Sequence, residues 1–287
     1  MLLRLIIVLI SVCSAVLPSV ARELTVTSFN IRYANPADGQ YTWSARAHAA
    51  CHAINMIRPD ILGTQEVLHE QLLNMKSMLP SYAVVGVGRD DGRTQGEYAA
   101  LWYNTDRFEP ADSGNFWLSA TPLVAGSIGW DAACVRIATW ALLTDRTTGS
   151  QVLALNTHLD HVGPVARRLG AQLVLSMLDS ISGHRDIPVV VTGDFNSGPA
   201  DKVIIDITDR SKPLWLNDSR TTAPSVEGPE WTFHDFGRVE PAQRERIDYV
   251  FYRGPLRPLK YVTSQPADTA GMFLSDHCPV TVTFNLD

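Results

Sequence analysis

The strand-like segments of this sequence are joined in two different ways, and this limits the folds open to the chain. Early segments such as "ELTVTSFNIRY" and "DILGTQEV" are separated by a helical pattern over residues 43–58, which Pro59 ends. In the middle of the chain, "EYAALWYN", "VRIATWALLTD" and "QVLALNTHL" follow one another without helices between them. A purely parallel sheet needs a crossover after nearly every strand. We therefore expect an α/β fold with two mixed β-sheets covered by helices.

Later segments continue this pattern. A helix is predicted over residues 164–181, followed by the apolar strand "IPVVVTGDFN" and by strands at "RIDYVFYR" and "HCPVTVTF". Two stretches rich in Gly, Ser, Pro or polar residues, 108–131 and 211–244, are predicted to be loops, the second one close to the functional site. Because the first and last strands both carry candidate site residues, we expect one domain over residues 22–287.

The first 21 residues have the features of a secretory signal peptide. Arg4 supplies a positive charge, an apolar core follows, and Ser19-Val20-Ala21 forms a small-x-small cleavage site. This apolar core is too short for a membrane span. We predict cleavage near Ala21, a secreted or periplasmic location, no transmembrane segment in the mature chain, and a monomer.

Composition excludes some functions and leaves others open. The formal net charge of the 287 residues is −6, and no cluster of Lys and Arg suggests a general nucleic-acid groove. This charge is compatible with a phosphate-bearing substrate, since a bound divalent cation inverts the local field. After signal cleavage three cysteines remain, Cys51, Cys134 and Cys278, which permit at most one internal disulfide.

Polar side chains recur at the ends of the predicted strands. Period-two alternation places Asn156 and His158 on one face of "LALNTHLDH", and the same rule groups the Asp and Asn of "VTGDFNSGP". Each such residue alone has a structural alternative: a turn cap, a surface loop or, for Asp248, an ion pair with Arg246 or Arg244. Their coincidence at strand ends predicts one carboxylate-rich pocket, built from Asn30, Glu66, Asn156, His158, Asp194, Asn196, Asp248, Asp276 and His277.

These residue types favour metal-assisted chemistry at phosphorus. Carboxylates such as Glu66 and Asp276 are hard oxygen ligands that suit Mg²⁺ or Mn²⁺, whereas zinc would want more His or Cys. A metal held in this way polarises a phosphoryl oxygen. His277 beside an acidic partner is a candidate general base for water.

Six of these segments resemble the endonuclease/exonuclease/phosphatase superfamily, which has the DNase I-like fold. They are "TSFNIR", "GTQEV", "NTHLD", "VTGDFNS", "RIDYVF" and "LSDHCPV", in that family's order between residues 27 and 280. The blocks "GNFWLS", "GWDAACVRIATW" and "GEYAALWYN" are similar to its secreted bacterial branch, related to CCR4-like metal-dependent phosphoesterases. The resemblance implies a four-layer α/β sandwich, with two packed mixed β-sheets flanked by helices and the site at one edge.

The resemblance also implies a metal centre. Glu66 would be the principal metal ligand, and Asn30 would support it. Asp276 would lie near the metal or orient a partner. The expected cofactor is Mg²⁺ or Mn²⁺.

Catalytic roles follow from the same resemblance. Asp194 would orient or deprotonate the attacking water, Asn196 would hold a phosphate oxygen, and His158 would contact the scissile phosphate. His277, paired with Asp248, would complete the site as a base or as a hydrogen-bond donor. The resemblance leaves open which of Asp194 and His277 takes the proton.

Three further residues are candidates for substrate binding. Arg136, in "CVRIATW", is placed to reach a substrate phosphate, or else forms an ion pair with Glu97 or Asp131. Asp160 and His161 extend the "NTHLDH" run beyond the usual family core, where they would widen the site or position Arg167 at the start of the next helix. Asn156 shares a face with the site histidine of the same strand.

Together these features predict an exported, Mg²⁺-dependent phosphoesterase that hydrolyses a phosphodiester or phosphomonoester with metal-activated water. The substrate is left open among a small molecule, a lipid head group and nucleic acid. A secreted nuclease is the first alternative, although the basic loops of a DNA-cleaving enzyme are not evident. A non-catalytic binding module of the same fold would have lost Glu66, the "GDFN" pair or His277, and none of these is missing.

Overall fold

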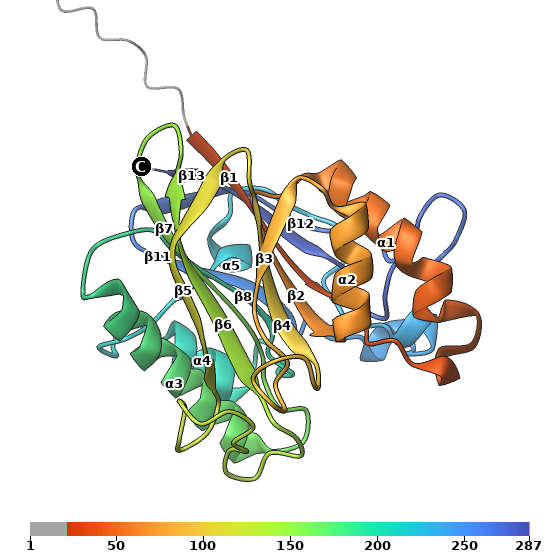
Figure 1. Ribbon diagram of the computed structural model, residues 1–287, viewed down its shortest axis with the longest axis horizontal. Coiled ribbons are helices and arrows are strands. Elements are labelled where there is room, and N and C mark those ends of the chain that lie inside the picture. The colour runs from red at the N-terminus through yellow and green to blue at the C-terminus, as the bar shows by residue number, and fades with distance from the viewer. Residues whose placement is uncertain (1–21, 287) are drawn as a thin grey trace, which may run out of the picture.

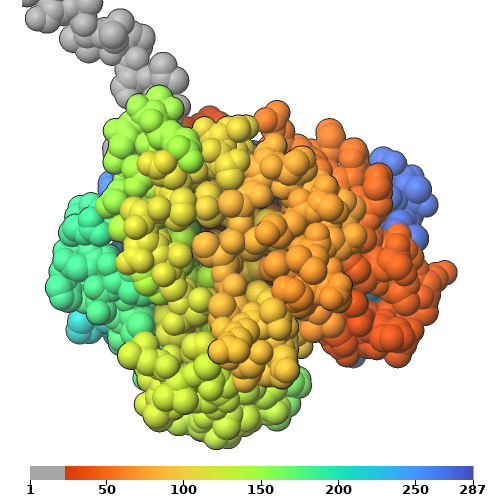
Figure 2. Space-filling view, viewed as in Figure 1, coloured from red at the N-terminus to blue at the C-terminus, as the bar shows by residue number. Residues whose placement is uncertain are grey.

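Two β-sheets pack face to face and carry helices on both outer faces in the computed structural model, which describes residues 22–286 (Figure 1). The four layers run from α1 and α2 through the two sheets to α3 and α4, which confirms the predicted four-layer α/β sandwich. The predicted signal peptide lies outside the described residues. In the space-filling view, the orange residues that include α1 and α2 adjoin the yellow residues of the middle of the chain (Figure 2).

The first sheet has the strand order β10-β12-β13-β1-β2-β4-β3. Parallel pairing joins β1 to β2, and antiparallel pairing joins β1 to β13. Its strands are β1 (Arg22–Asn30), β2 (Ile61–Val67), β3 (Tyr82–Val85), β4 (Tyr98–Asn104), β10 (Val226–Glu227), β12 (Leu256–Thr263) and β13 (Val280–Leu286).

The second sheet has the order β5-β6-β7-β8-β11-β9. Parallel pairing joins β7 to β8, and the other neighbours are antiparallel. Its strands are β5 (Phe108–Trp117), β6 (Ile137–Asp145), β7 (Gln151–His158), β8 (Val189–Asp194), β9 (Asn217–Asp218) and β11 (Asp248–Arg253). Both sheets are therefore mixed, as the two kinds of strand connection predicted.

Helices cover the sheets because each has one apolar face. The buried face of α1 (Trp43–Ile57) and α2 (His69–Met78) packs on the first sheet, and that of α3 (Pro164–Ser182) and α4 (Lys202–Thr208) packs on the second. A proline begins α3, and Gly183 ends it in the left-handed conformation. Short pieces complete the set: α5 (Ser219–Thr222), η1 (Pro36–Tyr41), η2 (Asp235–Gly237) and η3 (Pro241–Gln243).

A third apolar cluster fills the space between the sheets. Val26, Val190, Val250 and Val282 are almost completely buried in it. These residues alternate along their strands with residues that face the helices, as period two requires. The interior is thus apolar along most of each strand, and the polar strand ends stand apart from it.

Some sequence predictions were wrong in detail. Residues 108–117 form the edge strand β5, not a loop, and Pro110 lies beside a bulge in its pairing with β6. Proline and polar residues are tolerated on an edge strand because one side of its backbone needs no partner. Both α4 and β12 were missed.

Cys51, Cys134 and Cys278 are all free thiols. Between residues 22 and 286, no helix has the length and apolar character needed to cross a membrane.

Candidate active site

Strand register brings the predicted site residues to one rim of the two sheets. In the first sheet, Asn30 at the end of β1 pairs with the residue before Glu66 on the parallel strand β2. In the second sheet, Asp194 lies between its two register partners, His158 on β7 and Asp248 on β11. Carboxyl ends of neighbouring parallel strands meet at the same edge. Residues far apart in the sequence therefore become neighbours here.

Asn30 connects the two sheets at this rim. Its side-chain Nδ2 donates hydrogen bonds to Oε1 of Glu66 at 3.0 Å and to Oδ2 of Asp194 at 2.9 Å. Glu66 has a positive φ of 63° at a register shift in the β2–β4 pairing, and this bulge directs a strand-end side chain into the site. A buried amide thus holds two carboxylates from different sheets at fixed positions.

The loop before β13 supplies the last two site residues. Ser275 Oγ donates to the backbone oxygen of Asn30 at 2.7 Å and lies 3.0 Å from Oδ1 of Asp276. Nδ1 of His277 lies 2.8 Å from Oδ2 of Asp248, and its Nε2 lies 3.8 Å from Oδ2 of Asp194. The imidazole therefore stands between two carboxylates.

The alternative ion pair for Asp248 is not formed. Arg246 instead pairs with Asp218, with Nη2 and Oδ2 2.8 Å apart. Arg244 donates through Nε to the backbone oxygen of Val239. Asp248 therefore pairs with His277 and with neither arginine.

A pocket of about 630 Å³ opens at this rim. Seven of the predicted residues line it: Glu66, Arg136, His158, Asp194, Asn196, Asp276 and His277. Asn30 and Asp248 are fully buried and support the lining residues through the contacts given above. The fold thus brings most of the predicted residues to one pocket.

Asn156 does not reach the pocket, and its prediction as a substrate-binding residue is corrected. Its Nδ2 donates to the backbone oxygens of Thr64 and Ala100, and its Oδ1 accepts from Gln65 Nε2 at 2.6 Å. A Cβ at Gly63 would lie 2.6 Å from the same Oδ1, so glycine is needed for this approach. Asn156 precedes His158 on the same face of β7 and therefore lies farther from the rim. There its hydrogen bonds join the two sheets.

Asp160 is also buried beneath the pocket surface, with 2% of its area exposed. It accepts hydrogen bonds from three backbone N–H groups and pairs with Arg136, with Nε and Oδ2 3.4 Å apart. Its expected contact with substrate is therefore corrected to a contact with Arg136. Neither Glu97 nor Asp131 is the partner of Arg136: Glu97 pairs with Arg89 at 2.6 Å, and Asp131 accepts from the first turn of α3.

Burial and neighbouring charges shift the site's proton equilibria in opposite directions. Burial, together with the nearby Asp248, raises the pKa of Asp194 to about 7. For His277, burial alone would lower the pKa, but the carboxylates of Asp248, Asp194 and Asp276 outweigh it and raise the pKa well above its usual value. The three carboxylates therefore favour the imidazolium form of His277.

His158 is neutral. Burial, then the guanidinium groups of Arg136 and Arg89, lower its pKa well below the ordinary value. Its Nε2 lies 3.0 Å from Nδ2 of Asn196, which also donates to the backbone oxygen of Leu159. His158 and Asn196 are thus held together at the pocket floor as neutral polar groups.

The carboxylates at this rim fit a hard divalent cation. Burial and the like charge of Glu66 raise the pKa of Asp276, and a cation between the two would relieve this repulsion. Asp194, Asp248 and His277 also offer ligand atoms within 4.8 Å of one another. The His277–Asp248 hydrogen bond places a proton in that group, so the side with Glu66, Asp276 and Asn30 suits Mg²⁺ better.

Several lining residues were not predicted. Arg32, Tyr33, Arg89 and Asp235 all border the pocket. Arg32 lies inside the quoted segment "TSFNIR", so its position offered a signal. Arg89 lies in a polar loop with no periodicity, and only the folded chain brings it to the site.

Comparison with known proteins agrees with this geometry. Residues 27–277 match the sequence profile of the Endonuclease/Exonuclease/phosphatase family. A solved structure of an endonuclease/exonuclease/phosphatase from Bacteroides vulgatus is 42% identical, with a TM-score of 0.88, over 93% of this chain and 100% of that chain. A mannosyl-6-phosphatase from Bacteroides thetaiotaomicron is 34% identical, with a TM-score of 0.83, over 91% of this chain and 99% of that one.

A curated relative is more distant. Nocturnin from Xenopus laevis is 26% identical over 227 residues, which cover 73% of this chain and 54% of that protein. The chain therefore spans about half the length of this relative.

Proposed function

The chain belongs to the endonuclease/exonuclease/phosphatase family, and from this premise we propose that it is an exported, Mg²⁺-dependent phosphoesterase. Members of the family hydrolyse phosphoester bonds, so the chain is a hydrolase of that class. The observation that carries the proposal is Asp194, which lies beside the buried His277–Asp248 pair and shares Asn30 with Glu66. Export is supported by the signal-like residues 1–21.

Asp194 is the better candidate for the base. With a pKa of about 7, its anionic form is populated near neutral pH and its proton affinity matches the task. His277 already holds a proton between carboxylates and therefore cannot accept another. As an imidazolium it is placed to stabilise negative charge that develops on the phosphoryl group.

Glu66 and Asp276, with Asn30 behind them, are the residues that would hold Mg²⁺ or Mn²⁺. When bound, the cation would neutralise these carboxylates and draw charge from a phosphoryl oxygen. Asn196 and His158 would orient the phosphate at the pocket floor. Both are fixed by hydrogen bonds and carry no charge.

The mannosyl-6-phosphatase supports a sugar phosphate as the first substrate to test. The pocket supports it too, because about 630 Å³ accommodates a monosaccharide phosphate. Tyr33 and Phe233 border the pocket and offer aromatic surface to a sugar ring.

Hydrolysis by the purified protein tests the proposal. We expect Mg²⁺-dependent phosphate release from mannose 6-phosphate or p-nitrophenyl phosphate, and its loss on addition of EDTA. Glu66→Gln should lower kcat/KM by about 10³-fold or more, because the cation loses a charged ligand. Glu70→Gln, a carboxylate change on an exposed position of α2, is the matched control and should keep full activity. Full activity of Glu66→Gln would refute the metal site.

A further inference from the structure

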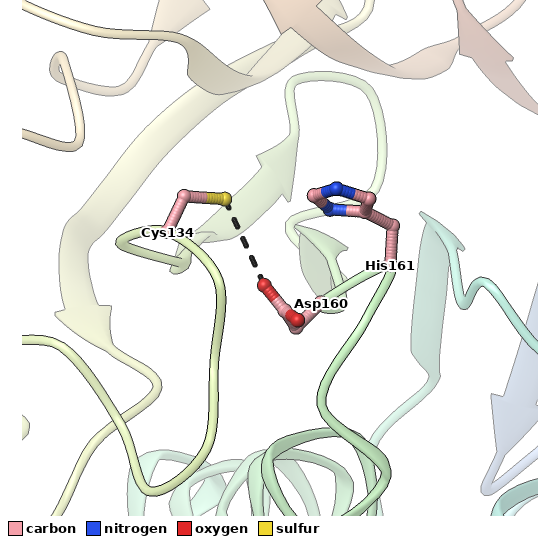
Figure 3. A group of neighbouring side chains, drawn as sticks. All are labelled: Cys134, Asp160 and His161. Carbon is pink, nitrogen blue, oxygen red and sulfur yellow. Dashed lines mark hydrogen bonds between the residues drawn. The ribbon is translucent and has the colours of Figure 1, made fainter.

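A second Asp–His cluster borders the same pocket through Cys134 and His161. Cys134, Asp160 and His161 offer ligand atoms within 4.8 Å of one another, and both Asp160 and His161 come from the segment after β7 (Figure 3). However, Oδ1 of Asp160 accepts from the backbone N–H groups of Val162 and Gly163, at 2.9 and 2.7 Å. Its Oδ2 faces further donors. These oxygens are therefore already used.

Arg136 makes this cluster unsuitable for a cation. Its Nη2 lies 2.9 Å from Nδ1 of His161, and its Nε lies 3.4 Å from Oδ2 of Asp160. A guanidinium beside two of the three candidate ligands repels a divalent ion. The cluster instead holds Arg136 in place, with 5% of the residue exposed at the pocket wall.

Arg89 stands beside Arg136 on the same wall. Its Nη1 donates to Oε2 of Glu97 at 2.6 Å, and Trp117 Nε1 donates to its backbone oxygen. Both arginines keep one buried N–H group without a partner: Nε in Arg89 and Nη1 in Arg136. Buried donors without acceptors are costly. The wall is therefore ready to bind an anion.

Beside these arginines the pocket narrows. Arg89, Arg136 and His158 line both the pocket and a small recess of about 10 Å³. A recess of this size has room for about one oxygen-sized atom. Nδ1 of His158 is also buried without a partner. The recess therefore accepts a terminal oxygen atom of a ligand but not a larger group.

We infer that Arg89 and Arg136 bind the unsubstituted anionic oxygens of a terminal phosphoryl group, which makes the site selective for phosphomonoesters over phosphodiesters. A terminal oxygen accepts several charge-assisted hydrogen bonds. An ester oxygen is a weaker acceptor, and the recess of about 10 Å³ is too small for its carbon substituent. This inference rests on the proposed phosphoesterase function and names its substrate class.

Hydrolysis of two chromogenic esters tests the inference. With Mg²⁺ present, kcat/KM for p-nitrophenyl phosphate should exceed that for bis-p-nitrophenyl phosphate at least tenfold. Arg136→Met should lower the monoester value by about 10- to 100-fold, the equivalent of one or two hydrogen bonds to a charged group, and the diester value by less than threefold. Arg89→Met should act in the same direction, and Arg136→Lys should recover part of the monoester activity.

Arg167→Met is the matched control. Arg167 donates to the backbone oxygen of Asp160 at 3.0 Å but does not line the pocket, so its loss should leave the ratio of the two activities unchanged. Equal losses on both esters in Arg136→Met and Arg89→Met, or a wild-type preference for the diester, would overturn the inference alone. Absence of hydrolysis of either ester by the wild type would overturn it together with the proposed function.

Discussion

Two clusters that border one pocket contain nearly the same residue types but differ in chemistry. One consists of Asp194, Asp248 and His277, and the other of Cys134, Asp160 and His161. Asp194 and Asp160 are equally buried, each with 2% of its area exposed. Residue type and burial therefore do not distinguish them.

Hydrogen-bond donors do distinguish them. Burial and Asp248 raise the pKa of Asp194 to about 7. Burial also opposes ionisation of Asp160, but three backbone N–H groups and Arg136 outweigh it and lower that pKa well below its usual range. A buried aspartate is available as a base only where the surrounding donors leave its charge partly uncompensated. The donors around Asp160 suit it to a structural role, whereas Asp194 is the aspartate that we propose as the base.

The largest effect is expected from Asp194→Asn. Removing the proposed base should lower kcat for a phosphomonoester by about 10²- to 10⁴-fold, measured at pH 7.5 with saturating Mg²⁺. Asp160→Asn should lower it much less, because Asp160 acts only through the position of Arg136. Similar losses of kcat in the two variants would contradict the assignment of the base to Asp194 rather than Asp160.

Stability should depend on pH with opposite signs at the two aspartates. Because the pKa of Asp194 is raised in the folded state, this residue adds to the free energy of unfolding below about pH 4. This stabilisation is lost as the pH rises through about 7. In metal-free protein, Asp194→Asn should therefore gain stability relative to wild type across this window, by at most about 4 kcal/mol.

The lowered pKa of Asp160 has the reverse consequence. Asp160 adds to the free energy of unfolding above its unfolded-state pKa, near 4. This stabilisation is lost as the pH falls through the lower folded-state pKa. Asp160→Asn should thus cost about 2 kcal/mol at pH 7 and less in acid. Urea unfolding of wild type and both variants in EDTA, at pH 4, 5.5, 7 and 8, checks both signs. Parallel curves for the two variants would contradict the assignment.

The smallest effect is expected from Cys134→Ala. Burial raises the pKa of this thiol, and its contact with Asp160, at 3.7 Å, is long. The variant should keep activity within twofold of wild type and stability within about 0.5 kcal/mol. Thermal stabilisation of the wild type by Zn²⁺ that disappears in Cys134→Ala would show that this cluster does bind a metal.

Much of the fold and site could be predicted because the signals are local. Strand periodicity identified the ends that carry Asn30, Glu66, Asp194 and His277, and the fold class followed from how the strands are joined. The pattern failed at edge strand β5, where tertiary pairing overrides weak local propensity. It also failed at Asn156, because period two gives a face of a strand but not a depth along it.

The amino-acid sequence alone determined which residues end strands, which helices are amphipathic and which side chains can ligate a hard cation, because these properties depend on neighbours within a few positions. Tertiary structure alone decided that Asn30 joins Glu66 to Asp194, that Arg89 stands beside Arg136, and that Asp160 rather than Asp194 loses its basicity. Distances between strands and the number of donors around a buried charge arise only when distant segments meet. They set the pKa values on which the chemistry depends.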